Sequence, residues 1–336
     1  MVSSEEDVVE AWRSLLNGDP LPWLLEEDAP AVRHLTLRWL LDEPESSRGV
    51  RRSRAAAMRA GPIAAILGAQ DDGGWWVKPG AGYAPKYMGT VWSVVFLDQL
   101  GADGRDPRIR RACEYVLAHT RGANGGFGWN GSSSSVVHCL NGNLLRALVS
   151  FGWLDEPRVR GAISWEARAV TGEGFDGYHR WATSGPGFGC GINGTLPCAW
   201  GAIKALRGLA AIPPRRRSEL VRRAVTAGTE LLLSRDPAVA DYPTDSKVSP
   251  NWFKLGFPSG YVADMLQNLE VLSELGHARD PRLSRAVDLV LSKQDRLGRW
   301  RNEHAHNGKT WGDVERQGAP SKWVTLRACR VLKAAC

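Results

Sequence analysis

The sequence predicts an all-α fold in which helix pairs form a closed double ring. Apolar stretches with helical spacing recur along the chain, and most are followed by a short turn and a second, proline-led helix. No stretch alternates polar and apolar residues over a useful length. Long connections follow the second helices, so an antiparallel ring places them all on one face. We expect one domain covering residues 1–336.

About twelve helices are expected, in six pairs. The predicted ranges are 4–17, 30–42, 49–68, 88–101, 106–119, 137–152, 156–169, 197–211, 217–234, 260–276, 280–293 and 321–335. The more apolar helix of each pair is expected inside, and the Arg-rich helix outside. Leucines at 100, 148, 206, 269 and 332 anchor an irregular repeat along the inner helices.

The outer helices share a start signal. It reads "GRDPRIRRA" (104–112), "LDEPRVRGA" (154–162) and "ARDPRLSRA" (278–286). Asp106 and Asp280 can cap helices whose first residue is proline, where no intrahelical hydrogen bond is lost. Short turns therefore precede these helices.

The long connections are the expected location of a functional site. They cover residues 69–87, 120–136, 170–196, 235–259 and 294–320. Loops of this length are uncommon unless they are functional, and rigid scaffolds often present sites on loops. A cavity opening on this long-loop face is therefore predicted.

The frame Q-x-x-x-G-x-W occurs twice, as "QDDGGWW" (70–76) and "QDRLGRW" (294–300). A weaker copy, "RGANGGF" (121–127), keeps the glycine and an aromatic residue at the same spacing. The glycine allows the turn after an outer helix, the tryptophan can wedge between neighbouring pairs, and the glutamine can satisfy backbone groups. We interpret Trp76 and Trp300 as buried structural residues rather than site residues.

Composition indicates a globular protein without a membrane span. Hydrophobic residues make up 43% and charged residues 24%, and no apolar run approaches the roughly 18 residues that span a bilayer. The acidic start "MVSSEEDVVEAW" lacks a signal-peptide core, so a cytoplasmic location is expected. The net charge of +7 comes mainly from scattered arginines interleaved with apolar residues. This pattern favours solvated helix faces over nucleic-acid binding.

The two tryptophan frames resemble the QW repeats of squalene and oxidosqualene cyclases. The helix-pair ring resembles the (α/α)6 toroid that those cyclases share with the β subunits of protein prenyltransferases. The resemblance covers the chain from about residue 30 to the end, and it implies an isoprenoid or other largely apolar substrate. The D-x-D-D acid motif of class II terpene cyclases is absent, as is the prenyltransferase D-x-C motif. The chain has the length of one ring, whereas squalene cyclases have two.

Cysteine and histidine residues gather near two neighbouring inner-helix starts. His138 and Cys139 begin one, Cys198 begins the next, and His179 and Cys190 lie in the loop between. One interpretation is a zinc site, so the cofactor is expected to be none or a single zinc ion. A second is acid/base or nucleophilic catalysis, since a helix N-terminus lowers a thiol pKa. A third is ordinary packing of small buried residues.

Asp264 is a second candidate, because an acid on an apolar inner helix is costly unless it is paired or functional. It could act as a general acid with a raised pKa. The alternative is an ion pair with Lys322 or Arg327 on the following inner helix.

Aromatic residues near inner-helix starts could line the cavity and stabilise a cation. The substrate-binding candidates are Trp92, Trp129, Trp200, Trp252 and Tyr261, with Lys322 available for an anionic head group. The rings could equally close the floor of the ring.

We therefore predict an enzyme that performs cyclisation, hydration–dehydration or isomerisation on a small apolar molecule. Asp264 is the expected acid, and His138 with Cys139 or Cys198 the expected base. A zinc-dependent, prenyltransferase-like transferase is the first alternative. The second is a non-catalytic toroid that binds a lipid or protein partner. The sequence is also compatible with peripheral contact with a membrane. No nucleic-acid partner is expected, and the sequence does not fix an oligomeric state.

Overall fold

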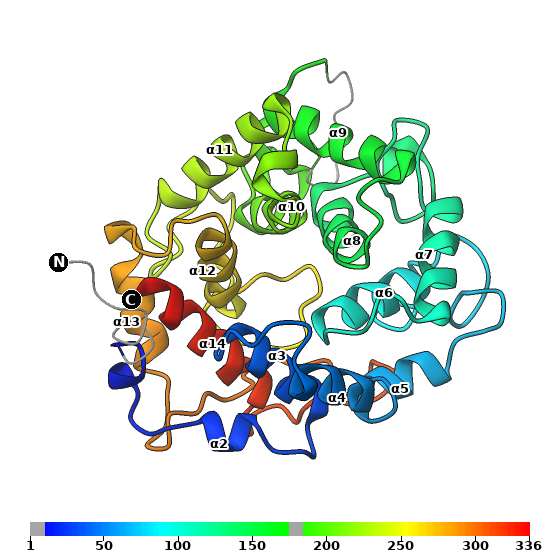
Figure 1. Cartoon of the computed structure of the whole chain (residues 1–336). Helices are drawn as coiled ribbons and strands as arrows, with labels where there is room; N and C mark the ends of the chain where they lie inside the picture. The colour runs from blue at the N-terminus through cyan, green and yellow to red at the C-terminus, as the bar shows by residue number, and fades with distance from the viewer. Residues whose placement is uncertain (1–10, 175–183) are drawn as a thin grey trace.

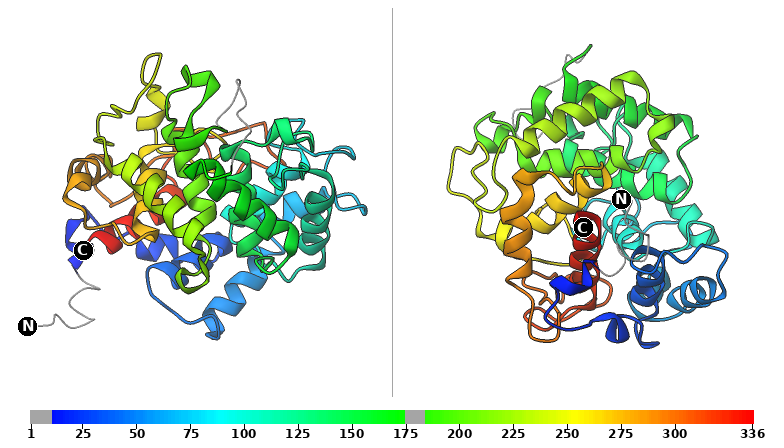
Figure 2. Two further views of the ribbon diagram at one scale, coloured as in Figure 1. Left: turned by 90° about the horizontal axis from the view of Figure 1, so that it is seen from above. Right: turned by 60° about the vertical axis from the view of Figure 1, so that its left-hand side comes forward.

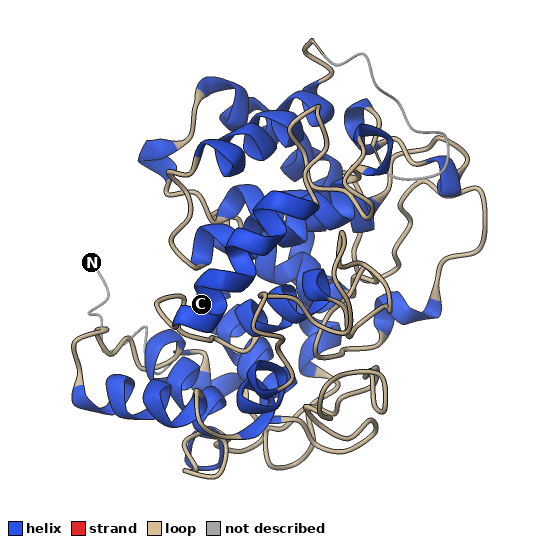
Figure 3. Ribbon diagram, turned by 90° about the vertical axis from the view of Figure 1, so that its right-hand side faces the viewer, coloured by secondary structure: helices blue, strands red, loops and turns tan. Residues whose placement is uncertain are grey.

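The computed structural model describes residues 11–174 and 184–336, whose helices form two concentric rings (Figure 1). The inner ring consists of α3 (Pro30–Trp39), α6 (Thr90–Gln99), α8 (His138–Ser150), α10 (Ala199–Ala210), α12 (Met265–Glu274) and α14 (Lys322–Ala335). The outer ring consists of α4 (Arg48–Ala57), α5 (Gly61–Gly68), α7 (Pro107–His119), α9 (Pro157–Thr171), α11 (Glu219–Leu233) and α13 (Ser284–Leu291). The described residues contain helices and loops but no strand, as Figure 3 shows.

The inner helices pack on one another around most of the ring. Contacts run from α6 through α8, α10, α12 and α14 to α3, and the path from α3 back to α6 passes through α4 and α5. The short helix α2 (Leu21–Leu24) lies beside α14, so the two ends of the described chain meet where the ring closes (Figure 2). The predicted (α/α)6 toroid is confirmed.

Burial explains which helices lie inside. Every residue of α6 from Thr90 to Leu97 is buried, as expected for a helix that is apolar all round. The outer helix α11 buries mainly one face, through residues such as Val221, Ala224 and Leu232 at helical spacing. None of the described helices is both long enough and apolar enough to cross a membrane.

The proline-led starts are capped as predicted. The side chains of Asp106, Glu156 and Asp280 each accept a hydrogen bond from the backbone N–H two residues later. Each cap satisfies one of the N–H groups that have no partner within the first helical turn. The acidic residue before each proline therefore fixes where the outer element begins.

The two tryptophan frames form matching structural staples. Trp76 and Trp300 are fully buried. The indole Nε1 of Trp76 donates to the Ile66 carbonyl of α5, and its backbone N–H donates to a threonine hydroxyl at the start of α6. Trp300 repeats this, with Nε1 donating to the Val290 carbonyl of α13 and its backbone N–H to the Thr325 hydroxyl of α14. Each tryptophan thus joins an outer helix to the next inner helix, and its predicted burial is confirmed.

The glutamines of these frames also act as expected. Gln70 Nε2 donates to the backbone carbonyl of Arg108 on the next outer helix. Gln294 Nε2 donates to the Leu15 carbonyl, and its Oε1 accepts from the Asn17 N–H. Gln294 therefore connects the loop after α13 to residues 15–17 and helps to close the ring.

A central segment, residues 254–262, runs through the interior of the ring before α12 (yellow in Figure 1). Ser259 exchanges two backbone hydrogen bonds with the Gln99 side chain, each of 2.8 Å. The Phe257 ring stacks on Trp323 with centroids 4.5 Å apart. The Arg327 guanidinium donates to the Gly256 carbonyl over 2.7 Å. Anchors on α6 and α14 hold this segment across the ring.

Two predicted helices differ from the observed ones, and a third lies mostly outside the described residues. The range 49–68 is broken into α4 and α5, because Gly61 has a positive φ of 61° and starts a new helix with Pro62 in its first turn. The range 260–276 begins only at Met265, since Asp264 caps the helix and the preceding residues belong to the central segment. Residues 4–10 of the range 4–17 lie outside the described residues, and the described remainder contains the helical residue Ala11 and the 3-10 turn Arg13–Leu15.

Candidate functional site

His138, the predicted base, is fully buried and holds two helices together. Its Nδ1 lies 2.5 Å from Glu166 Oε1 on α9, and its Nε2 lies 3.2 Å from the Gly185 carbonyl oxygen. The second oxygen of Glu166 accepts from the Asn141 amide over 2.5 Å. Both ring nitrogens are therefore occupied within the protein, which is the arrangement of a structural histidine.

Cys139, Cys190 and Cys198 lie near one another, as the ring order predicts. A hydrogen bond with Cys190, followed by burial and the proximity of Cys139, raises the pKa of the Cys198 thiol well above its ordinary value. The expectation that a helix start would favour a thiolate is thus wrong for Cys198. The apolar surroundings and the neighbouring sulfur outweigh the helix end.

No group of three or more His, Cys, Asp or Glu side chains is arranged to hold a metal within residues 11–174 and 184–336. The predicted ligand His179 lies outside the described residues. The zinc interpretation of the cysteines therefore gains no support from the geometry.

Asp264, the predicted acid, is buried and caps α12. Its carboxylate accepts from the backbone N–H groups of Gln267 and Gly256, over 2.7 and 3.0 Å. Its Oδ1 lies 3.8 Å from the Arg327 guanidinium, so Arg327 is the partner that the ion-pair alternative required. Burial raises the pKa of Asp264, and Arg327 opposes this rise. Its two backbone hydrogen bonds give Asp264 a positioning role for the central segment.

The aromatic candidates separate into two groups. Trp92 and Tyr261 belong to one cluster, with ring centroids 5.1 Å apart, and the Lys86 ammonium lies over both rings. Trp252 is buried, and its Nε1 donates to the Pro237 carbonyl. Trp129 and Trp200 are half-buried.

Lys322 closes the ring and is not available to a head group. Its ammonium lies 2.8 Å from Glu26 and 2.7 Å from Asp28. These acids follow α2, so the pair joins the start of α14 to the N-terminal part of the chain.

A cavity of about 480 Å³ lies inside the ring and opens on the short-turn face, opposite the predicted face. Its mouth includes the turn after α6, from Gly101 to Arg105, and the turn after α8. Phe257 and Ser259 of the central segment line it, together with Trp323. None of the predicted site residues lines this cavity. The reason is the central segment, which occupies the middle of the ring and leaves the open volume beside the inner-helix ends.

Charged residues of the inner helices surround the inner part of the cavity. Arg146 of α8 binds Glu274 of α12 through two hydrogen bonds of 2.6 and 3.1 Å, and Arg330 of α14 lies 3.0 Å from the same carboxylate. Arg327 binds Glu270 through bonds of 2.9 and 2.6 Å. Two glutamates thus pair with three arginines. The pairs of Arg146 with Glu274 and of Arg327 with Glu270 are bidentate, which makes them strong and fixed.

Asp98 and Arg207 are the remaining charged groups of this inner cluster. Burial raises the pKa of Asp98, although Arg146, Arg207 and the Ser150 hydroxyl oppose the rise. Burial and the like charge of Arg146 lower the pKa of Arg207. Both side chains line the cavity, and within the described part of the chain neither has an ion-pair partner at contact distance. Burial thus shifts Asp98 toward its protonated form, and a protonated carboxyl group is the form that can donate a proton.

His34 of α3 is a third titratable group that lines the cavity. Its Nδ1 lies 3.3 Å from the Val50 carbonyl oxygen. Burial and the neighbouring Arg54 lower the pKa of His34, which favours a neutral ring. With Nδ1 donating to Val50, Nε2 is the nitrogen that can accept a proton.

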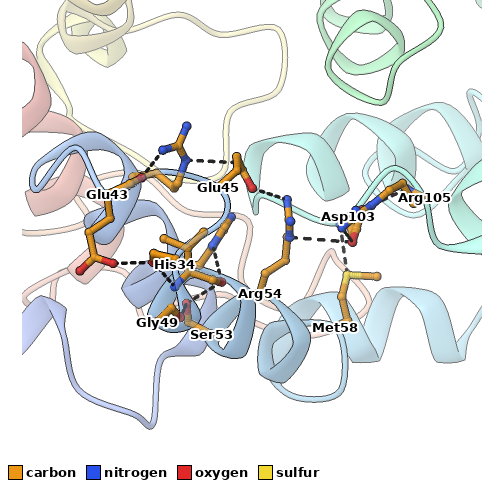
Figure 4. Close-up of polar contacts among 12 residues, drawn as sticks. His34, Glu43, Glu45, Gly49, Ser53, Arg54, Met58, Asp103 and Arg105 are labelled. Atoms are coloured by element: carbon orange, nitrogen blue, oxygen red, sulfur yellow. Dashed lines mark hydrogen bonds and ion pairs between the residues drawn. The ribbon is translucent and has the colours of Figure 1, made fainter.

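The rim of the cavity is a chain of ion pairs between two turns (Figure 4). Glu45 lies 3.1 Å from Arg38 and 2.9 Å from Arg54. Asp103 lies 3.8 Å from Arg54 and 2.8 Å from Arg105. Arg54 therefore joins the turn after α3 to the turn after α6, at the place where the inner ring is completed through α4 and α5.

No family model matches the chain, and no curated protein matches its sequence. Solved structures that resemble it include the type II terpene cyclase MstE from Scytonema, at 12% identity and a TM-score of 0.45, covering 98% of both chains. A polysaccharide lyase has 13% identity and a TM-score of 0.48, covering 99% of this chain and 97% of that one. A GH76 α-mannanase from Bacteroides thetaiotaomicron has 11% identity and a TM-score of 0.42, covering 99% and 96%. These three proteins have different activities, and such distant likeness assigns none of them to this chain.

Proposed function

We propose that the chain is an enzyme that transfers protons to and from a small molecule bound in the central cavity, with Asp98 as the proton donor. The observation that supports this most is the state of Asp98. It lines a cavity large enough for a small molecule, its pKa is raised by burial, and its charged neighbours leave it without a contacting ion-pair partner. Structural acids of this cluster, Glu270 and Glu274, are instead locked in bidentate pairs.

The reaction class follows from the groups present. Protonated Asp98 donates a proton to an alkene, a carbonyl or a leaving hydroxyl, and neutral His34 accepts one from the substrate or from water. The two groups come from different inner helices, α6 and α3. The shift of Asp98 toward a protonated acid and of His34 toward a neutral base is the division of roles that acid/base catalysis needs. Isomerisation, hydration–dehydration and cyclisation all need such a pair.

The walls suit a molecule with an apolar body. Trp39, Phe257 and Trp323 line the cavity beside the charged groups. Aromatic walls remove apolar surface from water and exclude solvent from a reacting centre. The expectation of an apolar substrate is therefore retained for the body of the molecule, while the acid moves from Asp264 to Asp98.

Deuterium uptake tests the proposal. The purified chain is incubated in D2O with a panel of isoprenoid alcohols, unsaturated acids and hydroxy acids, and mass spectrometry detects new deuterium or a change of mass by water. We expect uptake by at least one compound, with the rate reduced at least about a hundredfold in Asp98→Asn, the usual scale for loss of a general acid. Asp288→Asn, on the outer helix α13, is the matched control and is expected to keep the full rate. Unchanged uptake in Asp98→Asn, or no uptake by any compound, would overturn the proposal.

A further inference from the structure

We propose that Arg207 is the anchor for an anionic group, a carboxylate or a phosphate, of the molecule that binds in the central cavity. This inference deepens the proposed function by naming the substrate class, and it rests on that function only for the identity of the cavity. The proposed substrate is thus amphipathic: an apolar body with a negative head group.

Arg207 is the one arginine of the inner cluster that the described acids leave unpaired. Glu274 is shared by Arg146 and Arg330, and Glu270 is bound by Arg327. Arg207 has electrostatic interactions with these groups, but no hydrogen bond or ion pair to a described residue. Its five N–H donors are therefore available to a ligand in the cavity that it lines.

An unpaired cation at this position is costly for folding. Arg207 is half-buried, and taking part of a guanidinium out of water is unfavourable without a contacting partner; the like charge of Arg146 adds to the cost, while Glu270, Glu274 and Asp98 offset part of it. A shape-matched apolar side chain would avoid both penalties. Side chains whose placement costs stability are typical of binding and catalytic sites.

The local charge balance also favours an anion. The inner cluster contains four arginines, Arg146, Arg207, Arg327 and Arg330, against Glu270, Glu274 and Asp98. Even with Asp98 ionised, these four positive charges face only three negative ones. A cavity with one sign of charge in excess and low-dielectric walls concentrates ligands of the opposite sign.

The guanidinium also selects the shape of the ligand group. Arginine offers two parallel N–H donors that match two oxygens of a carboxylate or a phosphate. An anion held by Arg207 would keep the rest of the molecule near Asp98, since both side chains line the cavity and are close enough to interact electrostatically. Arg207 is therefore a binding residue, and it orients the substrate toward the acid.

Anion binding is measured by calorimetry with two probes, inorganic phosphate and succinate, on the full chain. Wild-type protein is expected to bind at least one, and comparing the two affinities shows which head group the site prefers. Arg207→Met is expected to weaken binding at least about tenfold, the scale of lost charge-assisted hydrogen bonds. Arg207→Lys keeps the charge but loses the paired donors, so an intermediate loss is expected. Arg222→Gln, an exposed arginine of α11, is the control and should stay within about twofold of wild type.

A denaturant midpoint shows that the variant is folded. Because Arg207 has no partner to lose, Arg207→Met is expected to unfold at the same or a higher urea concentration than wild type. Absence of binding by wild type, or binding within about twofold of wild type by folded Arg207→Met, would overturn the anchor. A lower midpoint for Arg207→Met would also count against it, since it would give Arg207 a structural role. Loss of anion binding in Arg207→Met combined with unchanged deuterium uptake in Asp98→Asn would support the anchor and reject the proposed acid.

Discussion

Replacing Trp300 with alanine is expected to remove much of the stability of the ring. The side chain is fully buried, and its Nε1 donates a 2.7 Å hydrogen bond to the Val290 carbonyl. Truncating a buried large aromatic residue costs about 3–5 kcal/mol, and an unsatisfied buried carbonyl adds about 1–3 kcal/mol. We therefore expect a loss of at least about 4 kcal/mol, against a total stability of about 5–15 kcal/mol for a typical protein.

The assay is urea unfolding at 25 °C, followed by circular dichroism and analysed by linear extrapolation. Trp23→Ala is the matched control, because Trp23 is half-buried on the ring surface under the Arg299 guanidinium. Its loss is expected to cost about 1 kcal/mol, the usual effect of a mutation outside the core. Trp76→Ala should behave like Trp300→Ala, since the two frames make the same contacts. A midpoint for Trp300→Ala no lower than that of Trp23→Ala would refute the staple interpretation.

Three further outcomes are expected. Burial opposes ionisation of Glu274, but Arg146 and other arginines outweigh it and lower its pKa to about 2. The ionised carboxylate therefore contributes about 3 kcal/mol to the free energy of unfolding above pH 4.5, and this is lost as the pH falls toward 2. Curves of stability against pH for Glu274→Gln should lack this loss. Because burial raises the pKa of Asp98, the folded protein holds this proton more tightly than the unfolded chain, and the stability this gives is present below the ordinary pKa and lost as the pH rises. Asp98→Asn should therefore be more stable than wild type at pH 7, with no such gain at pH 3. Gly142→Ala should lower the thermal midpoint by several degrees, because a Cβ there would lie 2.2 Å from the Lys204 carbonyl oxygen of the neighbouring inner helix, and a midpoint equal to wild type would contradict the close packing.

The fold was predictable because each repeat carries local signals. The acid–proline start at Asp106 and Asp280 fixes helix beginnings through backbone hydrogen bonds, which depend only on neighbouring residues. The tryptophan frames are also local, since Trp76 and Trp300 each contact the helix just before and the helix just after. The order and direction of the helices follow from these signals.

The site was not predictable to the same extent, because it depends on how helices distant in sequence face one another. Asp264 is the most conspicuous acid in the sequence, yet it is occupied as the cap of α12. His138 meets Glu166 across two helices, a pairing that no spacing in the sequence indicates. The path of the central segment decides which face is open, and loop paths have no periodic signal.

One signal in the sequence could have located the cavity. The charged residues Asp98, Arg146 and Arg330 each stand two positions before an anchor leucine, at 100, 148 and 332. Charged groups at one repeat position of otherwise apolar inner helices must share one level of the ring. These charged groups surround the inner part of the cavity. Arg207 and Glu270, which also line it, directly follow the anchor leucines at 206 and 269.

The ionisation of Asp98 tests the central claim most directly. Carbon-13 NMR of carboxyl-labelled protein, with Asp98→Asn used to assign the signal, gives the pKa of Asp98 without and with inorganic phosphate. We expect a pKa above the ordinary aspartate value in the unliganded protein, because burial dominates. Phosphate should raise the pKa of Asp98 further, because an anion on Arg207 disfavours a second negative charge nearby. A pKa at or below the ordinary value that phosphate leaves unchanged would contradict both the proton donor and the anion site.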